Sequence, residues 1–243
     1  MQRIDMQNQS NYQISFEITA DRALFSDPAS KVGGEKLSYQ FPTYEALKGV
    51  LKGIYWKPTI TWYVDAVRVM NPIQMETECT KIVKWNSKDG DLAFSTYLTN
   101  VRYQVLAHYE WNMNRPEFTK DRDFKKYNAI IGRMIKTGRR TPIFLGVKDC
   151  LATSIEPCVF GEGEGTYDHA GTQVYGLMYH GTTYADEGYD DETRNRITTN
   201  YFIPKMENGI ITFPRPEECP VHYARHKMTM KVFNSDLPEE EFE

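Results

Sequence analysis

The sequence predicts an α+β fold of the ferredoxin-like kind, and three observations support this expectation. The predicted elements follow the order strand, helix, strand, strand, helix, strand, which is the split βαβ arrangement. More strands follow this unit, unlike the alternation of a doubly wound sheet. The chain has 243 residues, 40% of them hydrophobic, enough for one large domain or two small ones. We expect a ferredoxin-like domain with inserted loops and hairpins at 1–195, then a C-terminal β-hairpin or sheet part with an acidic tail at 196–243.

The first elements are predicted by periodic patterns. Residues 12–19 alternate apolar and polar side chains, which is typical of a half-buried strand. Thr43 is a suitable N-cap, and the apolar residues after it share one face of a short helix that ends before Pro58. The next strand is expected at 59–69, where the alternation shifts phase at 65–67 and indicates a β-bulge.

The middle of the chain predicts a hairpin and a second helix. A turn at 84–92 precedes a strand at 97–112, whose apolar side chains alternate. The second helix is expected roughly from Asp121 to Lys136, closed by Gly138.

The last part of the chain predicts short strands and loops. Strands are expected at 144–157 and 173–181, and Asn208-Gly209 predicts a tight hairpin turn. The stretch 161–168 alternates Gly with Glu at its start, which repels phosphate, and we expect it to be a flexible connection.

Charge is distributed unevenly along the chain. The net charge is −4, but five acidic residues lie at 185–194 and five more in the tail at 236–243. The segment 120–140 carries eight Lys or Arg against two Asp. Because local clustering creates an anion-binding surface, this segment indicates a nucleic-acid partner despite the negative total.

Several classes of function are disfavoured by the sequence. The four cysteines form no CxxC pair, so we expect reduced thiols and no zinc site. No metal or other cofactor is predicted, and His108 and His180 are expected to be structural. The polar N-terminus and the lack of an apolar run of 18 residues predict a cytoplasmic protein that does not enter membranes.

Two segments carry residues that suit RNA. Tyr55, Trp56 and Lys57 follow the first helix and could stack on a base and meet a phosphate, although they could also only cap the core. Basic residues gather where the second helix begins and could bind phosphate there, or form a solvated run paired with Asp121 and Asp123. With the glycine pair at 33–34 and its flanking lysines, the candidate RNA-binding residues are Lys31, Lys36, Trp56, Lys57, Lys120, Arg122, Lys125, Arg139 and Arg140.

A family resemblance covers nearly the whole chain after about residue 12. The stretch "KVGGEKLSYQFPTYEALKGVLKGIYWKPT", with "VRYQVLAHYEWNMNRP" and "ENGIITFPRPEECP", resembles the fifth CRISPR-associated family, Dvulg subtype, of type I-C systems. The resemblance implies a ferredoxin-like (RRM-like, RAMP-type) N-terminal domain with a small antiparallel β-sheet C-terminal part.

The resemblance also implies an activity. Such a protein is a metal-independent endoribonuclease that cuts the repeat hairpin of the CRISPR precursor RNA. It then retains the 5′ handle as a subunit of the type I-C surveillance complex, so CRISPR repeat RNA and other subunits are the expected partners. The implied catalytic residues are Tyr55, in "IYWKP", and Lys126; Tyr127 occupies the place where the family has His.

With these implied residues and no metal, we expect cleavage through attack by the RNA's own 2′-hydroxyl. Lys126 would stabilise the negative charge of the phosphorane, and Tyr55 would orient the 2′-hydroxyl proton or exchange it. A neighbouring ammonium is expected to lower the pKa of the tyrosine, and a site without His predicts a slow enzyme with an alkaline optimum. Two alternatives stay open, a non-cleaving scaffold that binds the RNA handle and an interaction protein that binds duplex DNA.

Overall fold

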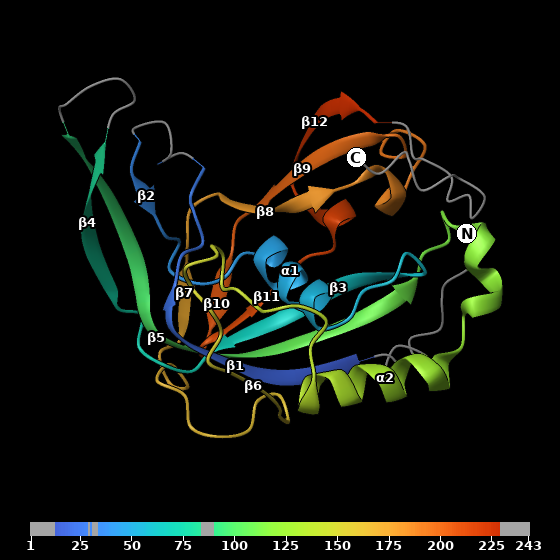
Figure 1. Ribbon diagram of the computed structural model, residues 1–243, viewed down its shortest axis with the longest axis horizontal. Helices are drawn as coiled ribbons and strands as arrows, with labels where there is room; N and C mark the ends of the chain where they lie inside the picture. The colour runs from blue at the N-terminus through green and yellow to red at the C-terminus, as the bar shows by residue number, and fades with distance from the viewer. Residues whose placement is uncertain (1–12, 29, 31–33, 84–89, 229–243) are drawn as a thin grey trace.

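The computed structural model describes residues 13–228 apart from 29, 31–33 and 84–89 (Figure 1). Within them the main helices are α1 (Tyr44–Ile54) and α2 (Phe124–Thr137), with short 3-10 helices η3 (Pro116–Asp121), η4 (Ala185–Glu187) and η5 (Pro216–Glu218). The strands are β1 (Gln13–Ala23), β2 (Lys36–Leu37), β3 (Ile60–Val69), β4 (Met75–Val83), β5 (Gly90–Trp111), β6 (Ser154–Pro157), β7 (Thr172–Val174), β8 (Met178–Thr183), β9 (Arg196–Phe202), β10 (Lys205–Glu207), β11 (Ile210–Thr212) and β12 (Val221–Lys227).

The main sheet has the strand order β6-β1-β5-β3-β11-β10-β7, and neighbours along this path are antiparallel. In the chain, α1 lies between β1 and β3, and α2 lies between β5 and β6. A smaller sheet has the order β12-β9-β8 (Figure 1). The predicted α+β class, with mostly antiparallel strands and few helices, is therefore confirmed.

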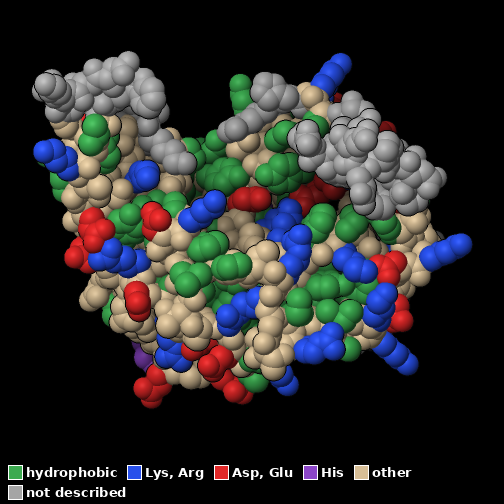
Figure 2. All heavy atoms as spheres, viewed as in Figure 1, with side chains coloured by type: hydrophobic (Ala, Val, Ile, Leu, Met, Phe, Trp, Pro, Cys, Tyr) green, Lys and Arg blue, Asp and Glu red, His purple; other side chains and the backbone are tan. Residues whose placement is uncertain are grey.

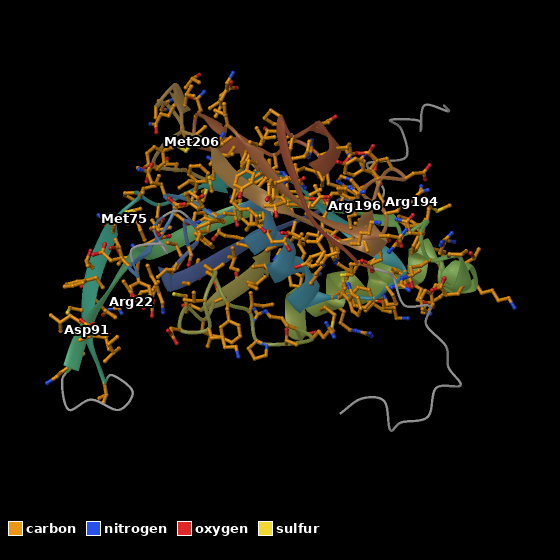
Figure 3. The ribbon with its side chains drawn as sticks, turned by 90° about the horizontal axis from the view of Figure 1, so that it is seen from above. Arg22, Met75, Asp91, Arg194, Arg196 and Met206 are labelled. Carbon is orange, nitrogen blue, oxygen red and sulfur yellow. The ribbon has the colours of Figure 1, made fainter. Side chains whose placement is uncertain are left out.

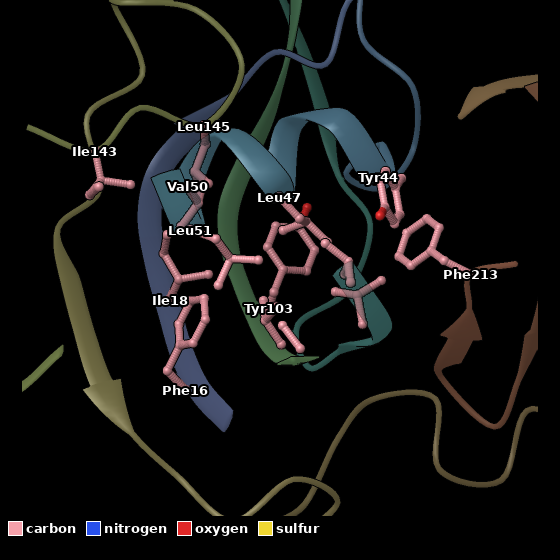
Figure 4. Close-up of a cluster of buried hydrophobic side chains, with 14 of the residues drawn as sticks. Phe16, Ile18, Tyr44, Leu47, Val50, Leu51, Tyr103, Ile143, Leu145 and Phe213 are labelled. Atoms are coloured by element: carbon pink, nitrogen blue, oxygen red, sulfur yellow. The ribbon is translucent and has the colours of Figure 1, made fainter. Parts of the chain in front are cut away.

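Helix α1 packs one apolar face against the main sheet. The Thr43 side chain caps its N-terminus by accepting a hydrogen bond from the Ala46 N–H at 3.1 Å. Leu47 and Leu51 are fully buried in the same core cluster as Tyr103 of β5 (Figure 4). Burying each of these leucines contributes about 1.5–3 kcal/mol, so the predicted apolar stripe fixes how α1 lies on the sheet.

Two local predictions are confirmed by the backbone. The pairing of β3 with β5 shifts register between Val64 and Ala66, which is the predicted bulge. Asn208 and Gly209 have φ values of 48° and 81° and join β10 to β11. Positive φ at both central residues defines the tight hairpin turn that an Asn-Gly pair favours.

Two predicted elements need correction. The second helix begins at Phe124 rather than near Asp121, because η3 precedes it and Asp123 is its N-cap. Of the strand predicted at 144–157, only Ser154–Pro157 forms β6, and one bridge joins Phe144 to Leu151. Gly146 has φ of 94° and a Cβ there would overlap the backbone of Leu24, so close packing against the end of β1 shapes this loop.

The stretch 161–168 is held in place, contrary to the expected flexible connection. Arg68 is 4% exposed and donates hydrogen bonds to the carbonyl oxygens of Glu162 and Gly163 and to the Asp168 carboxylate. A buried guanidinium needs such partners, so one side chain of β3 fixes the loop.

The proposed boundary at 195/196 stays a prediction about domains. Hydrogen-bonded strand pairs cross it at three places, because β9 pairs with β8, β10 with β7 and β11 with β3. The acidic tail at 236–243 lies outside the described residues. Within the described residues, no helix is long and apolar enough to cross a membrane, and the four cysteines are unpaired.

Of the two histidines predicted to be structural, His180 is fully buried and His108 is 11% exposed, and both are hydrogen bonded. His180 lies 2.9 Å from the Pro214 carbonyl oxygen and stacks on Tyr44, and burial lowers its pKa to about 3. The Nδ1 atom of His108 lies 2.7 Å from Asp65. Burial alone would lower the pKa of His108, but hydrogen bonds to Asp65 and Glu110 raise it to about 9.

The raised pKa of His108 predicts a pH-dependent stability. Since the unfolded value is near 6.5, protonated His108 contributes about 3 kcal/mol that is fully present below pH 6.5 and is lost as the pH rises through 9. Denaturant unfolding of the wild type should therefore show a falling free energy between pH 6.5 and 9. His108→Asn, which has no titrating ring, should show a flatter curve; equal slopes for the two proteins would contradict the assignment.

Candidate active site

The candidate site forms where α1 ends and α2 begins. Tyr55 is the C-cap residue of α1, and its backbone N–H bonds to the Leu51 carbonyl oxygen at 2.9 Å. The Trp62 Nε1 atom donates to the Tyr55 carbonyl oxygen at 2.8 Å, which fixes the cap on β3. Lys126 lies in the first turn of α2, where the Asp123 side chain accepts a hydrogen bond from its backbone N–H. Two well-capped helix ends therefore hold these predicted catalytic residues.

The carboxylate of Asp121 lies at the centre of the site. Its Oδ1 is 2.6 Å from the Lys126 Nζ, and its Oδ2 is 2.8 Å from the Lys57 Nζ. The Tyr127 hydroxyl donates to the same Oδ2 at 2.7 Å. These three hydrogen bonds hold the pKa of Asp121 far below its usual range, with Lys126 the largest influence. Asp121 is therefore a permanent anion that joins three predicted site residues.

Tyr55 presents a buried hydroxyl to this cluster. Its side chain is 7% exposed, and its Oη has no hydrogen-bond partner among the described residues. Its ring meets the Tyr127 ring edge-on, with centroids 5.7 Å apart. A buried hydroxyl without a partner costs about 1–3 kcal/mol, which identifies this atom as a candidate for contact with a ligand.

The predicted lowering of the Tyr55 pKa is wrong as a net result, although Lys57 and Lys126 do act in the predicted direction. Burial is the largest influence and raises the pKa, and it outweighs the opposing effect of Lys57 and Lys126. Asp121 acts in the same direction as burial, because its negative charge disfavours a phenolate. Tyr55 is therefore a neutral phenol at neutral pH.

Tyr127 belongs to the core as much as to the site. Its side chain is fully buried, and its ring centroid is 5.0 Å from that of Trp111. Burial and the bond to Asp121 raise the pKa of Tyr127 well above its usual value. Lys126 is half exposed, and Asp121 raises the pKa of its ammonium. The site therefore holds neutral phenols beside charged ammonium groups.

Some of the predicted RNA-binding residues border this site. Trp56 is 37% exposed, and the Arg140 guanidinium lies 5.4 Å from its ring centroid. Lys125 and Lys120 are exposed on α2 and η3. Arg139 is exposed and donates to the Ile155 carbonyl oxygen at 3.3 Å. In the view of Figure 2, Lys and Arg side chains are prominent on the part of the face that α2 occupies.

Other predicted residues stand apart from the site or serve the fold. The Arg122 guanidinium donates to the carbonyl oxygens of Asn112 and Arg115 at 3.0 and 3.2 Å, so it stabilises the turn after β5. Lys36 is exposed on β2, far from α2 (Figure 1). In Figure 3, Met75 of β4 and Asp91 of β5 lie at the end of the molecule opposite to Arg194. Lys31 lies outside the described residues.

Asp121 is the residue of the site that sequence reasoning missed. The sequence indicated only a counter-charge within a basic run. The decisive contact, Lys57 to Asp121, joins residues 64 positions apart. The only signal in the sequence was an acidic residue just before the basic first turn of a helix. That pattern does not distinguish a solvent-exposed ion pair from a carboxylate that several site residues bind together.

Fold and site together define an α+β protein in which two lysines and a tyrosine hold one carboxylate between two helix ends. The chain belongs to the Cas5d family of CRISPR-associated proteins, since the family model described as "CRISPR-associated protein (Cas_Cas5)" matches residues 13–214. A curated relative from Mannheimia succiniciproducens, named "CRISPR pre-crRNA endoribonuclease Cas5d", is 41% identical over 64 residues. This match spans 26% of the chain and only 28% of the relative.

Two solved structures are similar over most of their length. One, a CRISPR-associated protein, has a TM-score of 0.69 and 28% identity, and the match covers 87% of this chain and 96% of the other. The second, a functionally uncharacterized protein from Streptococcus mutans, has a TM-score of 0.68 and 32% identity with the same coverage. Both agree with the fold described above.

Proposed function

We propose that the protein is a metal-independent endoribonuclease that cleaves CRISPR precursor RNA in its repeat hairpin. The observation that carries the proposal is that Lys57 and Lys126 converge on one anion, Asp121, beside Tyr55, whose ring packs edge-on against Tyr127. Ammonium groups that hold a carboxylate suit a phosphodiester equally well. The printed name of the Mannheimia succiniciproducens relative, a pre-crRNA endoribonuclease, supports the choice of RNA.

The proposed chemistry uses the RNA's own 2′-hydroxyl. Its oxygen attacks the adjacent phosphorus and loses its proton to solvent water. The bond to the 5′-oxygen breaks, that oxygen takes up a proton from solvent, and a 2′,3′-cyclic phosphate and a 5′-hydroxyl result. Lys126 and Lys57 stabilise the negative charge that develops on the phosphorane. The Tyr55 phenol hydrogen-bonds the reacting 2′-hydroxyl and orients it. A neutral phenol is a weak base, so the proposed reaction is slow at neutral pH.

We further propose that the core unit is ferredoxin-like and belongs to the RRM-like, RAMP-type group. Support comes from the strand order β6-β1-β5-β3 and from the placement of α1 and α2 in the chain. In this proposal the cytoplasmic protein keeps the 5′ handle of its product and remains a subunit of the type I-C surveillance complex.

One observation favours a second candidate, a scaffold that binds the RNA handle without cutting it. Both tyrosines of the site have raised pKa values, and Tyr127 stands where the family resemblance implies His. A site without a ready base could bind RNA and leave cleavage to another nuclease.

The test is incubation of labelled CRISPR repeat RNA with the full chain in EDTA. We expect one cut within the hairpin and products with a cyclic phosphate and a 5′-hydroxyl. Intact RNA that stays bound would favour the scaffold. Displacement of the RNA by unrelated duplex DNA at moderate salt would favour the duplex-DNA alternative.

Lys126→Ala tests the ammonium group directly. We expect single-turnover cleavage to fall about a hundredfold, because a preorganised charge is lost from the transition state. RNA affinity should change only a few-fold, since other cations border the site. Lys125→Ala removes the same charge from the adjacent exposed position, and we expect it to cleave at nearly the wild-type rate. Equal loss in both variants would mean that the two lysines act only through general charge.

A further inference from the structure

We propose that the Asp121 carboxylate occupies the place of the scissile phosphate in the RNA-free protein and is displaced when RNA binds. This proposal rests on the proposed function, because it takes a phosphodiester as the ligand. It identifies the chemical class that the site binds, and it makes Asp121 an internal competitor of the substrate.

The contacts of Asp121 are those that a phosphate would require. One carboxylate receives the Lys126 ammonium on Oδ1, and the Lys57 ammonium and the Tyr127 hydroxyl on Oδ2. These donors come from the loop between α1 and β3 and from the first turn of α2, and they converge on one carboxylate. Carboxylate and phosphate oxygens accept the same charge-assisted hydrogen bonds, so the two anions compete for one set of donors.

The state of Tyr55 indicates that the site is closed. Its hydroxyl is buried, lacks a hydrogen-bond partner among the described residues, and lies within the electrostatic reach of Lys57, Asp121 and Lys126. RNA therefore cannot reach this hydroxyl until a neighbouring group moves. Asp121 is 29% exposed, and a phosphate that takes over its lysines would leave its carboxylate free to turn into solvent.

Charge repulsion favours movement of the Asp121 carboxylate when a phosphate binds. With Asp121 in place, the charge of one lysine is cancelled and the other remains to attract RNA. If Asp121 stayed in place beside a bound phosphate, two anions would repel each other at close range. The depressed pKa of Asp121 means that protonation does not remove this repulsion near neutral pH. Movement of the carboxylate is the remaining solution.

Asp121→Asn tests the competition, with Asp123→Asn as the matched control. Both variants lose one negative charge, and Asn at position 123 keeps the N-cap of α2. The probe is fluorescein-labelled CRISPR repeat RNA, measured at several NaCl concentrations. We expect Asp121→Asn to bind about fivefold to tenfold more tightly, with a steeper salt dependence. Asp123→Asn should bind within about twofold of the wild type.

Unchanged or weaker RNA binding by Asp121→Asn would overturn the proposal, because an internal competitor must weaken binding. A second measurement uses wild-type protein with ¹³C-labelled aspartate, in which Asp121→Asn identifies the Asp121 signal. We expect RNA to raise the pKa of that carboxylate toward its ordinary value; an unchanged pKa in the complex would also overturn the proposal. Both measurements need only RNA binding, so a wild-type protein that fails to cleave would sink the proposed function and leave this test intact.

Discussion

Tyr55→Phe should reduce cleavage strongly and make the protein more stable. The change removes a single oxygen atom that is buried and has no hydrogen-bond partner among the described residues. Its loss removes a desolvation cost, so we expect the free energy of unfolding to rise by about 1 kcal/mol. Loss of the phenol from the transition state should reduce single-turnover cleavage by about 10³-fold. RNA affinity should stay within a few-fold of the wild type.

Tyr44→Phe is the matched control for this prediction. The Tyr44 hydroxyl is also buried without a hydrogen-bond partner in the described residues, but it lies at the other end of α1. We expect a similar gain in stability and wild-type cleavage. Denaturant unfolding and single-turnover assays on both variants give the comparison. If Tyr55→Phe cleaves like Tyr44→Phe, the Tyr55 hydroxyl has no part in the reaction.

The elements that the sequence predicted are those specified by neighbouring residues. Thr43 directly precedes α1, and the apolar residues recur at helical spacing within its 11 residues, so local pattern determines α1. The bulge at Val64–Ala66 and the Asn208-Gly209 turn are likewise determined by residues that are adjacent in the sequence. The loop at 144–151 was mispredicted because contact with β1, far away in the sequence, decides its shape.

The site shows the same division between local and tertiary information. Tyr55 and Lys126 could be proposed as site residues from motifs, and both lie at helix ends. The raised pKa of Tyr55 could not be predicted, because it results from packing against Tyr127 and its neighbours. The role of Asp121 depends on Lys57, which comes from another part of the chain. Burial and contacts between distant residues therefore determine the pKa of Tyr55 and the partners of Asp121, which local sequence patterns do not specify.

Tyr127→His should convert a slow site into a faster one. Imidazole titrates near 6.5 and can accept a proton at neutral pH, whereas the pKa of the buried Tyr127 phenol is raised out of this range. We expect single-turnover cleavage at pH 7 to rise about tenfold to a hundredfold. The wild-type rate should increase toward alkaline pH without an inflection near 6.5. The variant should gain an inflection at or slightly above 6.5, because the Asp121 carboxylate favours the imidazolium.

The cost of this change follows from the packing of Tyr127. Its ring contacts Trp111 and Tyr55 and is fully buried, so a smaller imidazole should reduce the free energy of unfolding by about 1–3 kcal/mol. Tyr127→Phe keeps the ring and has no titrating group, and we expect no new inflection from it. A folded Tyr127→His protein with the wild-type rate and pH profile would show that this position does not exchange protons with the RNA. Since the hydroxyl of Tyr127 already reaches Asp121, an imidazole there would lie beside the proposed phosphate position, where a base can act.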